Sequence, residues 1–382
     1  MKRFLPLLIA LFSLAGCNWF QPDIKDRHVV LVYFAGNNSL AQEGRGDYED
    51  LFNSWLPPVK DKEKILLVYR HFTEETPVLC RLSRDRHGNT VEDVIMEYPY
   101  STNSATAATL STVIADAEAA WPAGHHGLIL WSHATGFLPE GYYSHPKDQA
   151  GSGASLMSFG EDNGSEIEIT DLRKALSVHM YDFIVFDCCL MANVEVAYEL
   201  RNSCDYILFS PTEILSDGFP YEKMIQPIFS SGTEEAMRNI GMSYIEYYKA
   251  QSGVYQSATI SLVKCAEMDY LAAACAPVFR SHQDQIMVLD RSRIQRYSRY
   301  DRQFWYYDID DFVGRIATDS EYRKFISALD RAVIYKDATD RFLSIDILHY
   351  SGLSIYIPRP EYTILNNFYK TLQWNSATGL VM

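Results

Sequence analysis

A histidine and a cysteine each follow a run of apolar residues, and their side chains are the ones best suited to chemistry. Residues 127–131 precede His133, and residues 183–186 precede Cys189. The β-branched and aromatic content of both runs predicts buried strands. In a parallel sheet active sites gather beyond the carboxyl ends of the strands, so we expect the imidazole to lie beside the thiol. A base next to a thiol is the arrangement of a cysteine hydrolase.

Alternating strands and helices surround these two runs. Further strands are predicted at residues 29–35, 65–72 and 206–209, and residues 78–82 favour an extra hairpin or edge strand. Residues 103–121 read as a helix that stops before Pro122, and Thr170 is a candidate N-cap for a helix over 171–178. This alternation predicts a three-layer α/β/α sandwich with a mostly parallel central sheet.

The second half of the chain shows no obvious catalytic cluster. Helices are predicted over residues 234–250 and 266–283, with Pro277 expected to kink or shorten the second one. Strands are predicted at 258–263 and 352–358, and residues 297–311 are rich in aromatic side chains. We expect residues 226–382 to pack against a catalytic core of residues 28–225 and to add to its sheet.

The two chemical segments resemble those of the clostripain family of cysteine peptidases, which shares the caspase-like fold. Family members carry His-Gly and Asp-Ala-Cys-Leu-Met, and the matching stretches here are His133-Ala134 and Asp187-Cys188-Cys189-Leu190-Met191. Further segments match in order, at residues 29–38, 210–213, 217–221 and 352–358. The resemblance therefore spans nearly all of the chain and implies a catalytic dyad of His133 and Cys189.

Local patterns suggest how the dyad would work. The helical pattern that begins near Met191 would place Cys189 at a helix N-terminus, where the dipole lowers the pKa of a thiol. Backbone N–H groups of Cys189 and Ala134 are the expected oxyanion donors. Ala134 replaces the family glycine and keeps that amide. Cys188 occupies the family alanine position, so we expect it to be a small buried side chain.

Two acidic residues are candidates for recognising substrate. The resemblance implies that Asp187 lies in the S1 pocket and receives Arg or Lys, since a carboxylate in a dry pocket pairs well with guanidinium. The alternative for Asp187 is a cap on the following helix. Asp217 is a second candidate, at the rim of the S1 pocket, and its alternative is an ordinary turn residue.

A long loop over residues 138–166 separates the two catalytic strands. Lys147 is its only lysine or arginine. Because family members often mature by self-cleavage after such a residue, Lys147 is the candidate processing site, with an intact exposed lysine as the alternative. Residues 160–166 offer oxygen ligands for calcium but lack EF-hand spacing, which favours a plain acidic turn. No cofactor is required for the proposed chemistry.

The amino terminus has the features of an export signal. Lys2 and Arg3 precede an apolar stretch over residues 4–14, which is shorter than the roughly 20 residues that span a bilayer. Leu-Ala-Gly-Cys17 is the bacterial lipobox pattern. We therefore expect residues 1–16 to be a lipoprotein signal, Cys17 to carry lipid, and residues 17–27 to be a tether. Asn18 favours the outer membrane, on its periplasmic or outer face; the alternative is an ordinary cleaved signal.

Charge and cysteine usage exclude several classes of protein. The formal charge of −15 becomes −17 once Lys2 and Arg3 leave with the signal, so a nucleic-acid partner is not expected. The six cysteines besides Cys17 lack zinc-ligand spacing. The adjacent pair His125 and His126 has no partner at ligand spacing. Serine-hydrolase, metalloprotease and nucleotide-binding motifs are absent from the sequence.

The sequence thus predicts an exported cysteine endopeptidase that cleaves after Arg, and also after Lys, through an acyl-enzyme thioester. Its partners would be peptides or proteins with a basic P1 residue, and the family precedent implies a monomer. One alternative is a catalytically silent surface lipoprotein that binds peptide or glycan. Another is a peptidase of the same fold with non-basic P1 specificity.

Overall fold

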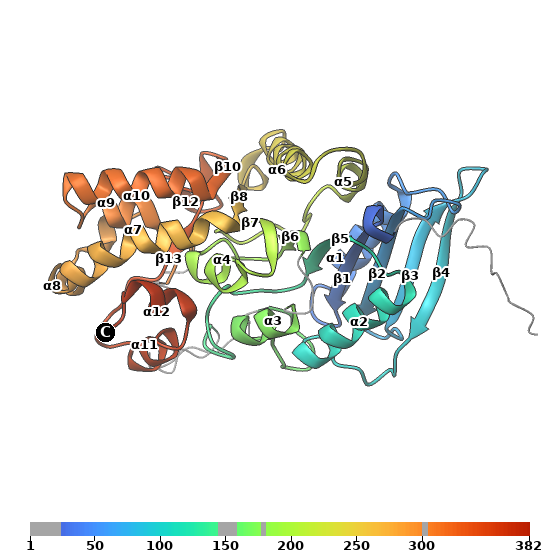
Figure 1. Ribbon diagram of the computed structural model, residues 1–382, viewed down its shortest axis with the longest axis horizontal. Helices are drawn as coiled ribbons and strands as arrows, with labels where there is room; N and C mark the ends of the chain where they lie inside the picture. The colour runs from blue at the N-terminus through green and yellow to red at the C-terminus, as the bar shows by residue number, and fades with distance from the viewer. Residues whose placement is uncertain (1–23, 144–158, 177–180, 300–304) are drawn as a thin grey trace, which may run out of the picture.

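A nine-stranded sheet forms the centre of the molecule in the computed structural model (Figure 1). The structure describes residues 24–143, 159–176, 181–299 and 305–382. The strands lie in the order β10-β8-β7-β6-β5-β1-β2-β3-β4. Their bounds are β1 His28–Gly36, β2 Lys64–Phe72, β3 Val78–Arg84, β4 Thr90–Glu97, β5 His125–Trp131, β6 Tyr181–Asp187, β7 Cys204–Phe209, β8 Thr259–Lys264 and β10 Val333–Ala338.

The middle of this sheet is parallel and its edges are antiparallel. Strands β2, β1, β5, β6 and β7 run in one direction. The hairpin strands β3 and β4 close one edge, while β8 and β10 close the other. The strands predicted at residues 29–35, 65–72, 127–131, 183–186, 206–209 and 258–263 are therefore present in this sheet, and 78–82 is part of an edge hairpin. The sequence analysis missed β4, because its side chains are largely exposed and carry no apolar run.

Helices cover both faces of the sheet, as predicted for a three-layer sandwich. Along β1, Val29, Leu31 and Tyr33 belong to one buried cluster, whereas Val30, Val32 and Phe34 belong to another. Strand side chains alternate between faces, so each cluster marks one face. The first face packs against α2 Ala107–Ala120, α3 Ile169–Ala175, α4 Val194–Leu200, α7 Met268–Ser281 and α10 Asp319–Ala332; the second packs against α1 Ala41–Asn53, α5 Ile225–Ser230 and α6 Thr233–Lys249.

The C-terminal part extends the sheet through β8 and β10 and adds a helical group beside it (Figure 1). Its remaining helices are α8 Gln283–Val288, α9 Ile309–Gly314, α11 Thr363–Tyr369 and α12 Gln373–Thr378. Pro277 lies inside α7, which continues to Ser281. The boundary at residue 225 between the core and this part stays a prediction.

The strand predicted at residues 352–358 is shorter than expected and does not join the central sheet. Only β13 Ser354–Ile355 is a strand, and it pairs with β9 Tyr307–Asp308 in a separate two-stranded sheet. The backbone N–H of Ser354 instead donates to the carbonyl of Ala192. This segment therefore supports the loop after β6 rather than the edge of the sheet.

The helix predicted to begin near Met191 starts later, at Val194. Leu190 adopts a left-handed conformation with φ of 61°, which a helix excludes. Asn193 then caps α4, because its side chain accepts a hydrogen bond from the N–H of Val196. Likewise α3 begins at Ile169 rather than after Thr170, without a side-chain cap. The Cys189 loop is thus separated from the helix by a tight turn.

Several predicted features lie outside the described residues, namely the signal segment 1–16, the lipidation site Cys17, the tether up to residue 23 and the processing site Lys147. Across the described ranges, every helix is too short or too polar to cross a membrane.

Asn193 gives a test of how this turn is held. Its amide also donates to the carbonyl of Leu190, at 2.9 Å, and the residue is fully buried. We expect Asn193→Ala to lower the free energy of unfolding by about 1–3 kcal/mol and to lower activity, since it removes both the cap and the bond to Leu190. Denaturant titration measures the first effect.

Thr106→Ala is the matched control. The side chain of Thr106 caps α2, a helix that is far from the Cys189 loop in the sequence. It should cost about 1 kcal/mol and leave activity intact. Equal activity in both variants would show that the turn does not depend on Asn193.

Candidate active site

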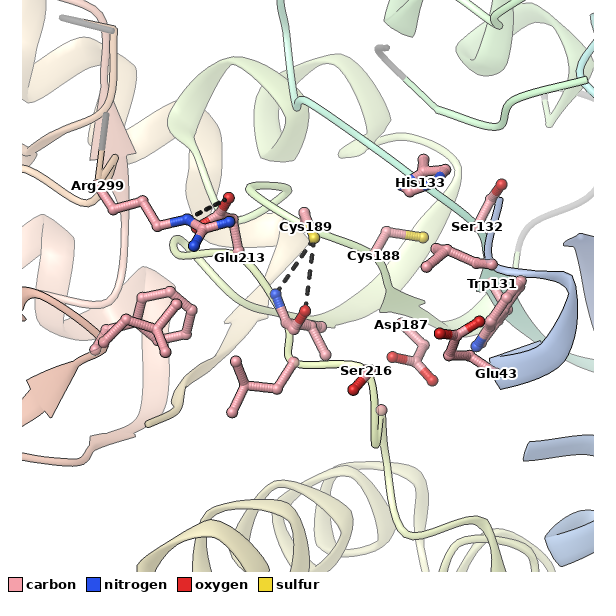
Figure 2. A pocket seen from close by; sticks show the side chains of 16 residues that line it. Glu43, Trp131, Ser132, His133, Asp187, Cys188, Cys189, Glu213, Ser216 and Arg299 are labelled. Atoms are coloured by element: carbon pink, nitrogen blue, oxygen red, sulfur yellow. Dashed lines mark hydrogen bonds and ion pairs between the residues drawn. The ribbon is translucent and has the colours of Figure 1, made fainter. Parts of the chain in front are cut away.

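Strands β5 and β6 bring His133 and Cys189 to the same edge of the sheet. The two strands are parallel neighbours, and Trp131 pairs in register with Asp187. His133 lies two residues beyond Trp131, and Cys189 lies two residues beyond Asp187. Both side chains line one cavity of about 310 Å³ (Figure 2). The predicted proximity of imidazole and thiol rests on this register.

The loops that carry these two residues are in direct contact. Gly136, with φ of 70°, lies so close to the second loop that a Cβ atom on it would be 2.5 Å from the carbonyl oxygen of Leu190. The loop that carries Cys189 is also hydrogen-bonded to the segment after β7, because the N–H of Leu190 donates to the carbonyl of Thr212 at 2.8 Å. Packing this tight leaves each loop little freedom to move away from the other.

The cavity has an acidic lining in an otherwise largely apolar wall. Trp131, Leu40, Ile214 and Leu215 contribute apolar surface, while Glu43, Asp187 and Glu213 contribute carboxylates. The remaining lining residues are Ser132, His133, Cys188, Cys189, Ser216, Gly218, Arg299, Phe342 and Leu343. Phe342, Leu343 and Arg299 come from the C-terminal part, so both parts of the chain build this cavity.

His133 is largely buried and neutral at physiological pH. Burial lowers the pKa of its imidazole to about 4, and the charge of Glu43 opposes this only in part. Its Nε2 lies 2.9 Å from the hydroxyl of Ser39 and 3.8 Å from a carboxylate oxygen of Glu161. A neutral imidazole is able to accept a proton, so His133 is in the form that a general base requires.

Cys189 is partly exposed to the cavity, and its thiol is protonated at rest. Burial, followed by the charge of Glu213, raises the pKa of the thiol to about 12. The N–H of Ile214 donates to Sγ at 3.4 Å, and Arg299, ion-paired with Glu213 at 2.8 Å, also favours the thiolate. The prediction that a helix N-terminus lowers this pKa is wrong, because α4 begins five residues later, after the Leu190 turn.

Asp187 lines the cavity, and its side chain is 4% exposed. Figure 2 shows its carboxylate between Ser216 and Glu43, which line the same cavity. The N–H of Phe219 donates to Oδ2 at 3.4 Å, yet burial still raises the pKa of this carboxyl. The helix-cap alternative for Asp187 is wrong, because Asn193 caps α4.

Asp217 lies outside the cavity lining, whereas Cys188 belongs to the lining but is almost fully buried. Asp217 is an exposed turn residue whose carboxylate accepts a hydrogen bond from the hydroxyl of Tyr247 at 2.9 Å. The structure therefore places it outside the cavity lining, in agreement with the turn alternative. Cys188 is 2% exposed, and its thiol donates to the carbonyl of Leu130 at 3.1 Å. It is a buried packing residue.

In the acidic turn over residues 160–166, the carboxylate of Asp162 is hydrogen-bonded to donors of the protein. Asp162 is fully buried and accepts hydrogen bonds from the Asn37 side chain and the Ser104 N–H, at 2.8 and 2.7 Å. In the part of the chain that the structure describes, no three His, Cys, Asp or Glu residues are arranged to hold a metal ion. His125 and His126 each pair with a carboxylate, of Asp182 and Glu118 respectively.

Several cavity residues were missed by the sequence analysis. Glu43, which lines the cavity, and Ser39, which is hydrogen-bonded to His133, follow β1, the parallel neighbour of β5. The carboxyl end of β1 must therefore open onto the same edge, and this signal was available in the strand pattern. Arg299 had no such signal, because only the fold of the C-terminal part brings it beside Cys189.

The fold and this cavity define a cysteine peptidase with a caspase-like α/β/α sandwich. A family model described as the clostripain family matches residues 32–379, so the chain belongs to the clostripain family. This membership decides against the catalytically silent alternative. None of the curated proteins matches the chain.

Solved structures agree with this assignment. The chain is similar to an inactive zymogen of a C11 protease from Parabacteroides distasonis, with 33% identity, 94% of this chain and 99% of that chain covered, and a TM-score of 0.80. A secreted C11 cysteine protease from Bacteroides thetaiotaomicron, in complex with an irreversible peptide inhibitor, shares 30% identity over 92% of this chain and 98% of that one, with a TM-score of 0.78.

A third structure covers part of the chain. It is a clostripain from Bacteroides thetaiotaomicron ATCC 29148 in complex with the peptide inhibitor BTN-VLTK-AOMK. It shares 25% identity, covers 57% of this chain and 97% of that chain, and has a TM-score of 0.50.

The charges around Cys189 make a prediction about its reactivity. Glu213→Gln removes the acid that opposes the thiolate and leaves Arg299 in place, so iodoacetamide should label Cys189 about threefold to tenfold faster at neutral pH. Arg299→Gln leaves Glu213 unneutralised and should slow labelling. Peptide mass spectrometry locates the label. Changes in the same direction in both variants would contradict this account.

Proposed function

We propose that the protein is an endopeptidase that cleaves after Arg and Lys by a dyad of Cys189 and His133. The observation that carries this proposal is the buried carboxylate of Asp187 in the same cavity as the thiol. A buried acid without a lysine or arginine beside it is costly. A basic side chain entering from the substrate would supply the missing cation and pair with it.

The protonation states suggest the order of events. The resting dyad is a neutral thiol and a neutral imidazole, so the proton moves from Sγ to His133 as sulfur attacks the scissile carbonyl. Since Ser39 engages Nε2, Nδ1 is the proposed acceptor. The proton then passes to the leaving amine, and water hydrolyses the thioester with His133 again as base. The N–H groups of Cys189 and Ala134 are the proposed oxyanion donors.

Two further observations support basic specificity over a neutral P1 residue. The protein carries a formal charge of −15, which attracts cationic peptides. The related clostripain was solved with an inhibitor whose peptide, VLTK, ends in lysine. In this chain Asp187 is the last residue of β6 and lines the same cavity as Cys189.

Maturation and location are proposed from the sequence. We infer that Lys147 is cleaved by the enzyme itself, in keeping with the zymogen form of the Parabacteroides relative. We further propose export as a lipoprotein anchored through Cys17, at the outer membrane, with the folded enzyme acting as a monomer.

The dyad and the pocket are tested together with peptides that differ only at P1. Cys189→Ala should abolish cleavage, whereas Cys188→Ala is the control that keeps activity. Asp187→Asn should lower kcat/KM at least about a hundredfold for Arg at P1, because it removes the charge partner. It should affect a Leu-P1 peptide far less. Equal loss on both peptides would remove the pocket role of Asp187.

Processing is tested by the size of the chain. The wild-type protein should separate into two fragments on a denaturing gel, while Cys189→Ala and Lys147→Ala should remain single chains. Added wild-type enzyme should cut the Cys189→Ala protein but not a Cys189→Ala, Lys147→Ala double variant. Cleavage of Lys147→Ala at the wild-type position would contradict the proposed site.

A further inference from the structure

A second buried carboxylate, that of Asp47, lies behind the wall of the proposed S1 pocket. Asp47 is on the inner face of α1 and is 5% exposed. The indole N–H of Trp131 donates to its Oδ2 at 2.7 Å. Trp131 lines the cavity and is the register partner of Asp187. Asp47 therefore holds the side chain of Trp131, the residue that pairs in register with Asp187.

Gly218 shows how near the two carboxylates lie to each other. A Cβ atom on Gly218 would be 3.0 Å from Oδ2 of Asp187 and 3.1 Å from Oδ2 of Asp47. Both carboxylates thus face one space the size of a methyl group. Gly218 adopts φ of 56° and lines the cavity, so this space lies at the cavity wall. Without a side chain at residue 218, nothing separates the two acids there.

The groups around this pair leave a surplus of negative charge. The charged groups that act on Asp47 are acids: Asp187, Asp50 on its own helix, and Asp217 in the turn. Asp187 accepts a hydrogen bond from the N–H of Phe219, and its charge raises the pKa of Tyr221, Tyr244, Tyr248, Cys188 and Cys189. Burial raises the pKa of both carboxyls, and the charge of Asp187 raises the pKa of Asp47 further.

Glu43 is independent evidence that this side of the cavity accepts a positively charged ligand. It lies one helical turn before Asp47 and lines the same cavity. Its Oε2 atom is buried and, among the residues that the structure describes, has no hydrogen-bond partner. A buried carboxylate oxygen is normally satisfied. The α1 side of the cavity therefore suits a positive group that none of the described residues supplies.

We propose that Asp47 is a second specificity-determining residue of the S1 pocket, and that Asp47 and Asp187 share one proton that a basic P1 side chain displaces to solvent. This inference rests on the proposed function of the pocket. Two carboxyl groups that face one dry space cannot both be ionised, so the free enzyme keeps one proton between Asp47 and Asp187. A guanidinium or ammonium group at P1 stabilises both carboxylates, and the proton leaves.

The displaced proton makes binding of a basic ligand depend on pH. Below the pH at which the pair loses its proton, the cation competes with that proton and binds more weakly. In Asp47→Asn, Asp187 no longer has a charged neighbour at Gly218, so it ionises at lower pH. The weakening on acidification should therefore move to lower pH in this variant.

Titration calorimetry with benzamidine, a reversible guanidinium-like probe, tests the proposal on the full enzyme. Heats measured in buffers of different ionisation enthalpy give the number of protons released. We expect release of about one proton near neutral pH in the wild type and much less in Asp47→Asn. Benzamidine should also bind Asp47→Asn about tenfold more weakly at high pH, where the wild-type pair is fully charged.

Two controls separate this role from a structural one. Asn at residue 47 keeps an acceptor for the indole N–H of Trp131. Glu49→Gln makes the same charge change at an exposed position on the same helix and should leave proton release unchanged. Undiminished release in Asp47→Asn, or no release in the wild type, would overturn the inference while leaving basic specificity intact. Failure of the wild type to bind benzamidine, with cleavage of neutral-P1 peptides, would overturn the proposed specificity itself and the inference with it.

Discussion

The pairing register between β5 and β6 is the constraint on which the rest of the site depends. Gly127 stands opposite Phe183, and a Cβ atom on Gly127 would lie 2.2 Å from the Phe183 ring. A slip of one residue would place a larger side chain against that ring and would also turn every side chain to the other face. Because this register pairs Trp131 with Asp187, it carries His133 and Cys189 to matching positions beyond the sheet.

Burial acts on the groups of this site in opposite directions. It lowers the pKa of His133 and raises that of Cys189, so both members of the proposed dyad are uncharged at rest. It also raises the pKa of Asp187 and Asp47. The same dry environment therefore favours a protonated thiol at Cys189 and would strengthen the pairing of Asp187 with the proposed basic side chain. Both effects follow from the exclusion of water from this cavity.

Local sequence patterns were sufficient for the sheet and for placing His133 and Cys189 at one cavity. Apolar runs ending at residues 131 and 186 predicted two buried strands, and their parallel pairing confirms this part of the fold. The same reasoning failed at Leu190, whose left-handed turn depends on bonds to Thr212 and Asn193. It also missed Asp47 and Arg299, since their places follow from helix packing and from the C-terminal part. Periodicity carries no information about such distant partners.

The charges around Cys189 are divided between two sides of the sulfur. On one side Arg299 neutralises Glu213, so the acid nearest the thiol is already paired (Figure 2). On the other side Asp187 and Glu43 line the cavity, and the charged groups acting on Asp47 behind them are acids. The proposed specificity follows from this difference: the protein itself pairs Glu213, whereas the proposed partner of Asp187 is a basic P1 side chain of the substrate. A lysine or arginine of the protein beside Asp187 would occupy the proposed S1 pocket and remove that selectivity.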